Sequence, residues 1–348
     1  MSDVTPVAAT PALTKKDFMS DQTIRWCPGC GDYSILAQVQ TVFPMLGIPR
    51  ENFAIVSGIG CSSRFPYYMD TYGFHTIHGR APAIASGLKI TRPELSVWIV
   101  TGDGDGLSIG GNHMIHLMRR NLDVNVLLFN NRIYGLTKGQ YSPTSPVGIK
   151  TKSTPMGSLD QPFNVLNLVL GAGATFVARS VDVFPQHLRA MVERTHAHKG
   201  TSFFEIYQNC NIFNDGAFDD FATRDVRDDR VLYLEHGKPM IWGATRRFGL
   251  KLVGMNLTKI EIGVDGTEAE VLVHDETNLP LAQLIAGMDT TEFAVPVGVF
   301  YRTDRPIYEE AVANQMAEST KKLGNGELRN LIATGELWRL GPNGVSER

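Results

Sequence analysis

The chain has 348 residues, 43% of them hydrophobic and 20% charged, and this balance excludes an intrinsically disordered protein. Its 33 basic residues against 36 acidic ones leave a net charge of −3, so no general basic surface is available for nucleic acid or an anionic membrane. No stretch reaches the roughly 20 apolar residues that a membrane-spanning helix needs.

Residues 1–20 contain two prolines and a Lys15-Lys16 pair, without the basic start and apolar core of a secretory signal. We expect them to form a flexible arm on a cytoplasmic protein. The four cysteines stand at positions 27, 30, 61 and 210, too few for a disulfide framework in a chain of this size. Their role is expected to be ligation or redox chemistry.

Apolar runs alternate with helical patterns through the first two thirds of the chain. Strands are predicted at 53–56, 96–101, 124–129, 175–178 and 202–207, and helices at 109–120 and 184–198. This alternation predicts an α/β domain over residues 21–215, with a mainly parallel sheet covered by helices on both faces.

The character of the sequence changes after about residue 215. Residues 216–348 are expected to form a C-terminal extension that closes over the core or contacts a partner. It contains a predicted strand-turn-strand around 264–266 and a predicted helix near 281–288.

The chemically suggestive residues follow predicted strands. They are Gly58, Gly60, Cys61, Asp103, Asp105, Asn130, Asn131 and Cys210. Ligands of open parallel sheets bind at the carboxyl ends of the strands, so these residues are expected to meet at one edge.

The strongest pattern is GDGDG after one strand and Asn-Asn after the next. Asp103 and Asn131 offer a carboxylate and an amide oxygen, which with a backbone carbonyl suit Mg²⁺ and its phosphate ligands. The glycines let backbone N–H groups approach those phosphates. GDG alone is more often an ordinary turn, but the downstream Asn-Asn favours a diphosphate site.

The cysteines leave several interpretations open. Cys27 and Cys30 form a CxxC pair like that of thioredoxin, although residues 21–25 make a poor preceding strand. Cys61 and Cys210 taken alone would be small buried core residues. Four thiolates also suit zinc, as in a four-cysteine interaction module, although structural zinc sites more often show two close pairs.

GDG followed by Asn-Asn resembles the thiamine diphosphate signature. Six motifs in this order closely resemble the β subunit of the 2-oxoacid:ferredoxin oxidoreductases, over about residues 25–211: WCPGCGDYS, GIGCSS, HTIHGRAPAIASGLK, GDGD, IGGNH and NNRIYGLTKGQYSPTS. The resemblance implies the thiamine diphosphate-binding fold.

The resemblance also implies a set of site residues. Mg²⁺ would be held by Asp103, Asn131 and the main chain of Ile133. The cofactor would be lined by Ile59, Gly60, Cys61, Ser62, His78, Gly104, Asp105, Gly135 and Leu136. Cys27, Cys30, Cys61 and Cys210 would hold one [4Fe-4S] cluster beside the thiamine.

The implied reaction is the reversible oxidative decarboxylation of a 2-oxoacid to acyl-coenzyme A and CO₂, with single electrons passing through the cluster to ferredoxin. The glutamate that thiamine enzymes set against the aminopyrimidine ring is expected from another chain, because the length after residue 215 does not allow a second α/β domain. The resemblance supplies that chain as an α subunit with pyrimidine and coenzyme A domains, in an (αβ)₂ assembly.

For the substrate we expect 2-oxoglutarate, with pyruvate or a branched-chain 2-oxoacid as the alternatives. Arg64 and Lys138 lie on loops at the expected site and are candidates for the substrate carboxylates. Two interpretations of other classes remain. A non-redox thiamine diphosphate enzyme subunit would not need four cysteines, and a four-cysteine zinc module would leave GDGD unexplained.

Overall fold

The computed structural model describes residues 13–335, 337, 339–342, 344 and 346–347. The chain divides after Ile307 into two compact units. The second unit contains α10 (Tyr308–Leu323), α11 (Leu328–Ile332) and the paired strands β12 (Arg339–Leu340) and β13 (Ser346–Glu347). Within the described residues no helix is both long and apolar enough to cross a membrane.

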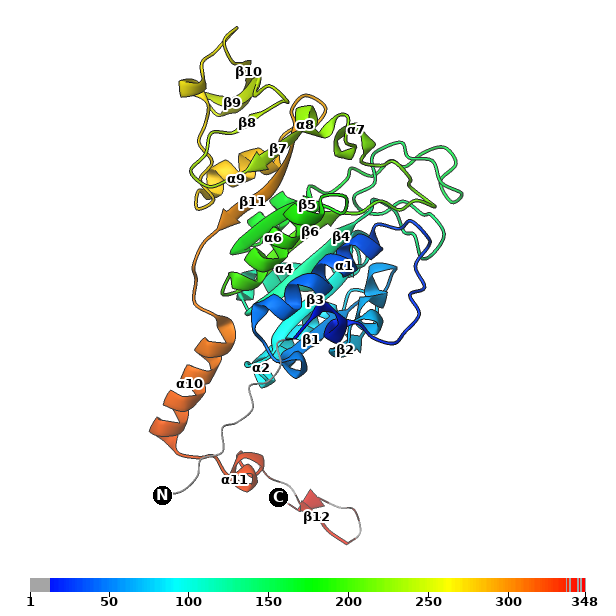
Figure 1. The fold of residues 1–348 in the computed structure, drawn as a ribbon. Helices are drawn as coiled ribbons and strands as arrows, with labels where there is room; N and C mark the ends of the chain where they lie inside the picture. Colours follow the sequence, from blue (N-terminus) through cyan, green and yellow to red (C-terminus); the bar gives the residue numbers. More distant parts are fainter. Residues whose placement is uncertain (1–12, 336, 338, 343, 345, 348) are drawn as a thin grey trace, which may run out of the picture. The chain divides into compact units, whose positions relative to one another are not determined.

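An eight-stranded sheet forms the centre of the first unit (Figure 1). In spatial order its strands are β2 (Tyr72–His75), β1 (Phe53–Ser57), β3 (Ser96–Gly102), β4 (Val124–Asn130), β6 (Ser202–Tyr207), β5 (Phe176–Val181), β11 (Val295–Arg302) and β7 (Val231–Leu234). Every neighbouring pair is parallel except β5 with β11. The predicted mainly parallel α/β fold is confirmed.

Helices pack on both faces of this sheet. One face carries α1 (Asp32–Val42) and α6 (Pro185–Ala197), which Figure 1 shows on the same side. The other carries α2 (Ala81–Thr91), α4 (Gly111–Arg120), α5 (Val165–Gly171) and α9 (Leu279–Ala286). Along β3, Val97 and Ile99 join one core while Trp98 and Val100 join the other. Burial on both faces explains why these strands are continuously apolar.

Short helices complete the first unit. They are α3 (Asp103–Leu107), α7 (Asp219–Ala222), α8 (Arg227–Arg230) and the 3-10 turns η1 (Lys15–Phe18), η2 (Phe43–Leu46), η3 (Arg50–Asn52), η4 (Ser62–Tyr68) and η5 (Glu268–Glu270).

The arm predicted over residues 1–20 does not extend to residue 20. Residues 1–12 lie outside the described part of the chain, but residues 15–18 form η1. Phe18 is fully buried, with its ring edge-on to Phe43 at 5.7 Å and Phe53 at 5.5 Å. Burial of one aromatic side chain therefore fixes this segment to the domain.

Two expectations for the C-terminal extension also need correction. The boundary expected at residue 215 does not separate compact units, because β7 and β11 lie in the main sheet. The antiparallel hairpin is formed by β9 (Phe248–Val253) and β10 (Asn256–Glu261), with β8 (Ile241–Trp242) beside β9. Its turn lies at Gly254, whose positive φ of 63° glycine tolerates, and not around 264–266.

Candidate functional site

Asp103 follows β3 directly and begins α3 at the carboxyl edge of the sheet. The residue is 2% exposed. Its Oδ2 accepts hydrogen bonds from Ser142 Oγ at 2.5 Å and from Thr144 Oγ1 at 2.6 Å. Burial raises the pKa of Asp103, and the two hydroxyl donors oppose that rise. A carboxylate oriented in this way is suited to a cation, because a bound ion would compensate its buried charge.

Asn131 lies at the end of the neighbouring strand, just after β4. Its Oδ1 accepts a hydrogen bond from the backbone N–H of Ile133 at 3.2 Å, and its Nδ2 donates to Gln208 Oε1 at 3.0 Å. The local turn therefore holds the side chain of Asn131 against the backbone of Ile133, and both residues line the same cavity.

A buried polar network supports this edge from behind. The single proton of the Thr144 hydroxyl can be shared between Asp103 Oδ2 and Asn130 Oδ1, which lies 2.9 Å from Thr144 Oγ1, and Asn130 Nδ2 donates to Glu205 Oε1 at 2.7 Å. Glu205 is in turn paired with Arg179 through an Nε to Oε2 contact of 2.7 Å. Because every link is buried, the network fixes Thr144 and through it the carboxylate of Asp103.

Asp105 organises the loops that surround Asp103. Its Oδ1 accepts from the backbone N–H groups of Ile59 at 3.1 Å and Gly79 at 2.8 Å, and contacts His78 Nδ1 at 3.0 Å. Its Oδ2 accepts from Thr101 Oγ1 at 2.7 Å. With these partners Asp105 holds the two loops together, in addition to lining the cavity described next.

Two glycines of the motifs are required by close approach. A Cβ on Gly58 would lie 1.8 Å from Oδ2 of Asp105, and a Cβ on Gly104 would lie 2.2 Å from Cε1 of Tyr134. Neither position has room for a side chain. The Tyr134 hydroxyl donates to the Gly104 carbonyl at 3.1 Å, which closes one wall of the site.

All twelve residues expected around the cofactor and its metal line one cavity. They are Ile59, Gly60, Cys61, Ser62, His78, Asp103, Gly104, Asp105, Asn131, Ile133, Gly135 and Leu136. The sequence analysis did not anticipate Gly102, Phe129, Tyr134 and Thr137, which complete the lining. The structure thus brings together loops that follow β1, β2, β3 and β4.

The four cysteines come from three loops beside this cavity. A Cβ on Gly135 would lie 3.5 Å from the sulfurs of both Cys61 and Cys210, so the two thiols flank that glycine. Trp26 Nε1 donates to the carbonyl of Cys61 at 2.7 Å, which attaches the Cys27–Cys30 turn to the Cys61 loop. Cys61 also lines the cavity, so the thiol group and the cofactor site share a residue.

The thiols influence one another electrostatically. Burial raises the pKa of Cys30 above its ordinary range and that of Cys61 to about 12, the charge of Asp32 adds to both shifts, and the charge of Cys210 adds less. Gln208 Nε2 donates to Cys30 Sγ at 3.3 Å. Thiols in this environment would need a nearby cation to stabilise their thiolate forms.

Within the described residues, no group of three or more His, Cys, Asp or Glu side chains is close enough to hold a single metal ion. A four-iron cluster has another requirement, because each thiolate binds a different iron and the sulfurs stand around a cube. Four cysteines on neighbouring loops provide the number of thiolates that such a cluster takes.

The two expected substrate residues lie outside the cavity lining. Arg64 belongs to η4, where its charge acts on the Cys61 thiol by lowering that pKa against the larger effect of burial. Lys138 is exposed, with a positive φ of 74°, and lines a neighbouring groove together with Ile133. Arg64 and Lys138 therefore lie beside the cavity and not in its lining.

Sequence reasoning missed Ser142, Thr144 and Gln208. The first two belong to the segment YSPTS, whose clustered hydroxyls after a Gly-rich loop were the only signal. Gln208 precedes Cys210 by two residues and contacts both Asn131 and Cys30. It therefore connects the expected metal site with the thiols.

Comparison with known proteins gives a consistent result. Residues 58–206 match the family model of the thiamine pyrophosphate enzyme C-terminal TPP binding domain. A Mycobacterium tuberculosis protein named 2-oxoglutarate oxidoreductase subunit KorB is 48% identical over 96% of this chain and 94% of its own length. The Archaeoglobus fulgidus 2-oxoglutarate synthase subunit KorB is 42% identical over 53% of this chain and 69% of its own.

A solved structure is similar over nearly the whole chain. It is the 2-oxoglutarate:ferredoxin oxidoreductase from Magnetococcus marinus with 2-oxoglutarate, coenzyme A and succinyl-CoA bound. The two chains share 34% identity and superpose with a TM-score of 0.72, covering 93% of this chain and 96% of the other. The likeness therefore extends well beyond residues 58–206, which the family model matches.

Proposed function

The chain belongs to the β subunits of the 2-oxoacid:ferredoxin oxidoreductases, and we propose that its own substrate is 2-oxoglutarate. The observation that carries the proposal is the cavity in which the expected thiamine and metal residues meet, directly beside the thiols of Cys61 and Cys210. The full-length relative named for 2-oxoglutarate supports this substrate over pyruvate or a branched-chain acid. A non-redox thiamine enzyme or a zinc module would not account for both features together.

In the proposed reaction, a 2-oxoacid and coenzyme A give acyl-CoA, carbon dioxide, a proton and two electrons, and each electron reduces one ferredoxin. Thiamine diphosphate, when bound, supplies a ring that stabilises the carbanion left by decarboxylation. Asp103, Asn131 and the carbonyl of Ile133 would hold the Mg²⁺ of its diphosphate. Ser142 and Thr144 would keep the Asp103 carboxylate oriented toward that ion.

The [4Fe-4S] cluster, when bound, supplies a one-electron acceptor next to the thiamine. Cys27, Cys30, Cys61 and Cys210 would be its ligands. Cys61 would fix the distance between the two groups, because it lies in a loop that also lines the cavity. Gln208 would donate to one ligand sulfur, the kind of contact that adjusts a cluster potential.

The partner is an α subunit that would carry the pyrimidine and coenzyme A domains, in an (αβ)₂ complex of cytoplasmic location.

We expect the isolated chain to be inactive and the complex to reduce ferredoxin or a viologen dye when given both 2-oxoglutarate and coenzyme A. The glutamate that activates the aminopyrimidine ring would come from the partner. Steady-state assays of the chain alone and of the complex test this, and full turnover by the chain alone would refute it. If the complex turned over pyruvate or a branched-chain acid faster than 2-oxoglutarate, the proposed substrate would be wrong.

Substrate selection by Arg64 gives a second prediction. Arg64→Met should raise the KM for 2-oxoglutarate on the order of tenfold more than the KM for pyruvate, since only the longer acid has a distal carboxylate for a guanidinium to bind. Assays of the complex with both acids and a viologen dye measure the difference. Arg92→Met is a matched control. Arg92 is an exposed residue at the C-terminal end of α2, just before the amino end of β3, whereas the cavity lies at the carboxyl ends of the strands. Equal losses for both acids would mean that Arg64 binds the carboxylate that both acids share or acts on the Cys61 thiol. In that case Lys138 is the remaining candidate for binding the distal carboxylate.

A further inference from the structure

The four thiols differ in their exposure. Cys27 is exposed, Cys30 and Cys61 are partly buried, and Cys210 is buried. The loop after Cys210 lies against the exposed turn, because Asn211 Nδ2 donates to the carbonyl of Pro28 at 2.6 Å. The Cys27–Cys30 turn and the loop after Cys210 therefore form one surface beside the exposed thiol of Cys27, over which an electron carrier can approach.

A basic groove opens beside this loop. It has a volume of about 660 Å³, and its lining includes Lys138, Lys150, Lys152, Ile212 and Phe213. We call it the lysine groove. The three lysines are exposed, and their ammonium groups form no hydrogen bond or ion pair with any residue that the structure describes. With three ammonium groups against one carboxylate, that of Asp215, the groove carries a net positive charge.

The centre of the same surface is apolar. Ile212 is 55% exposed and Phe213 is 38% exposed, two and three residues after the buried ligand candidate Cys210. The single carboxylate in the lining, on Asp215, already accepts a hydrogen bond from Asn209 Nδ2 at 2.9 Å. An apolar centre with a charged rim is typical of transient protein interfaces, in which charge steers the encounter.

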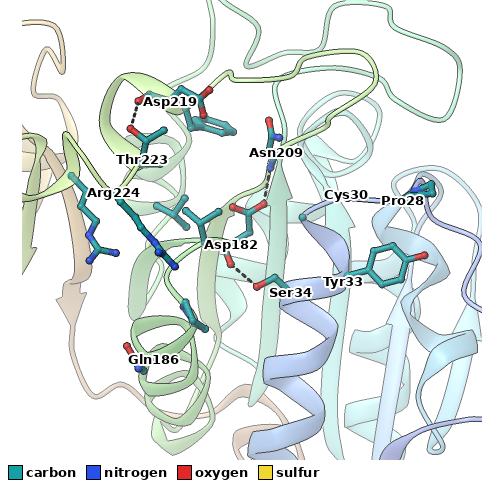
Figure 2. Close-up of a pocket in the computed structure, with 18 residues that line it drawn as sticks. Pro28, Cys30, Tyr33, Ser34, Asp182, Gln186, Asn209, Asp219, Thr223 and Arg224 are labelled. Carbon is teal, nitrogen blue, oxygen red and sulfur yellow. Dashed lines mark hydrogen bonds between the residues drawn. The ribbon is translucent and has the colours of Figure 1, made fainter.

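A larger cavity, lined in part by the Cys27–Cys30 turn, has a different character. It has a volume of about 1250 Å³, and Figure 2 shows Cys30 and Pro28 at one end and Arg224 at the other. Asp182 and Asp219 lie between them, and Arg227 adds a second cation. Two carboxylates and two guanidinium groups compensate one another, so this cavity does not select a partner by the sign of its charge.

We propose that the lysine groove, with Ile212 and Phe213, is the docking surface for an acidic one-electron carrier protein. The inference rests on the proposed function and identifies where its ferredoxin binds. Each docking event moves one electron out of the complex and reduces one carrier. Two carriers are therefore reduced for each 2-oxoacid oxidised. Steering by the lysines would raise the encounter rate, and the apolar pair would bring the carrier next to the Cys210 loop.

The test uses the complex with its α subunit and compares two double variants. Lys150→Glu/Lys152→Glu reverses the rim charge and leaves Lys138, a substrate candidate, unchanged. Lys15→Glu/Lys16→Glu is the matched control, an exposed lysine pair on η1 that is not part of the groove. Binding of oxidised ferredoxin is measured by calorimetry at several salt concentrations, and turnover is measured separately with a viologen dye.

We expect the groove variant to raise the ferredoxin Kd on the order of tenfold at low salt and to flatten its salt dependence, with dye-linked turnover unchanged. The control should match the unaltered complex in both assays. Unchanged ferredoxin affinity would overturn the proposal, as would loss of the α subunit from the groove variant, which would assign this surface to subunit assembly. Absence of dye-linked turnover in the unaltered complex would instead refute the proposed function, and calorimetry would still report on the groove.

Discussion

Replacing Asp103 by alanine is expected to abolish Mg²⁺-dependent binding of thiamine diphosphate. The carboxylate is 2% exposed and lies in the cavity with Asn131 and Ile133. Without it, the ion loses its one anionic protein ligand, and the charge of the diphosphate stays uncompensated in a partly desolvated site. The loss should exceed the roughly 10- to 100-fold that is typical of removing a group that only supports a metal ligand.

Calorimetric titration of the complex with thiamine diphosphate, with and without Mg²⁺, measures this loss. Thr144→Val gives a graded comparison, because it removes the 2.6 Å hydrogen bond to Asp103 and leaves the carboxylate in place. Its affinity should fall roughly 10- to 100-fold. The visible absorption of the cluster should be the same in both variants. Unchanged cofactor affinity in Asp103→Ala would show that the metal is held by other residues.

The strands of the central sheet were largely predictable, since their apolar runs are local and continuous. The strand at 202–207 begins and ends as predicted, and β3 and β4 differ from prediction by one residue. These segments are buried on both faces, which leaves little choice of residue type. The sequence therefore predicts most reliably where packing is most demanding.

The edges of the sheet could not be predicted in the same way. β2 is exposed along its whole length, so Tyr72–His75 has no apolar run that would identify a strand. β11 has such a run, but its neighbours are β5 and β7, which are far away in sequence. Strand pairing at this separation depends on the folded sheet rather than on local pattern. The expected boundary at residue 215 was wrong for this reason.

The candidate site follows the same division. Asp103 and Asn131 were found because parallel strands end at one edge, which is a property of the fold class. The resemblance to a family supplied the rest of the cavity lining, including His78 and Gly135. The roles of Ser142, Thr144 and Gln208 could not be predicted, because they depend on hydrogen bonds between loops that are distant in the sequence. Such contacts leave no periodic or spacing signal in a single sequence.

Replacing Cys30 by alanine should remove the iron–sulfur cluster and leave the thiamine site intact. Cys30 is more informative than Cys61, because Cys61 lines the cofactor cavity and Cys30 does not. A cubane cluster takes one thiolate at each iron, so three remaining cysteines leave one iron without its ligand. Visible absorption, iron and sulfide should fall together in the anaerobically purified complex.

Ferredoxin-linked and dye-linked turnover should both be lost with the cluster, because neither acceptor would receive electrons. Thiamine diphosphate should still bind in the presence of Mg²⁺, which separates this variant from Asp103→Ala. Gln208→Met is the matched control: it removes the 3.3 Å contact to Cys30 Sγ without removing a thiolate, so the cluster should remain. Full iron and sulfide content in Cys30→Ala would mean that this cysteine is no ligand. In that outcome the cluster would have to be held by the other three thiols and by a fourth ligand that is not a cysteine of this chain.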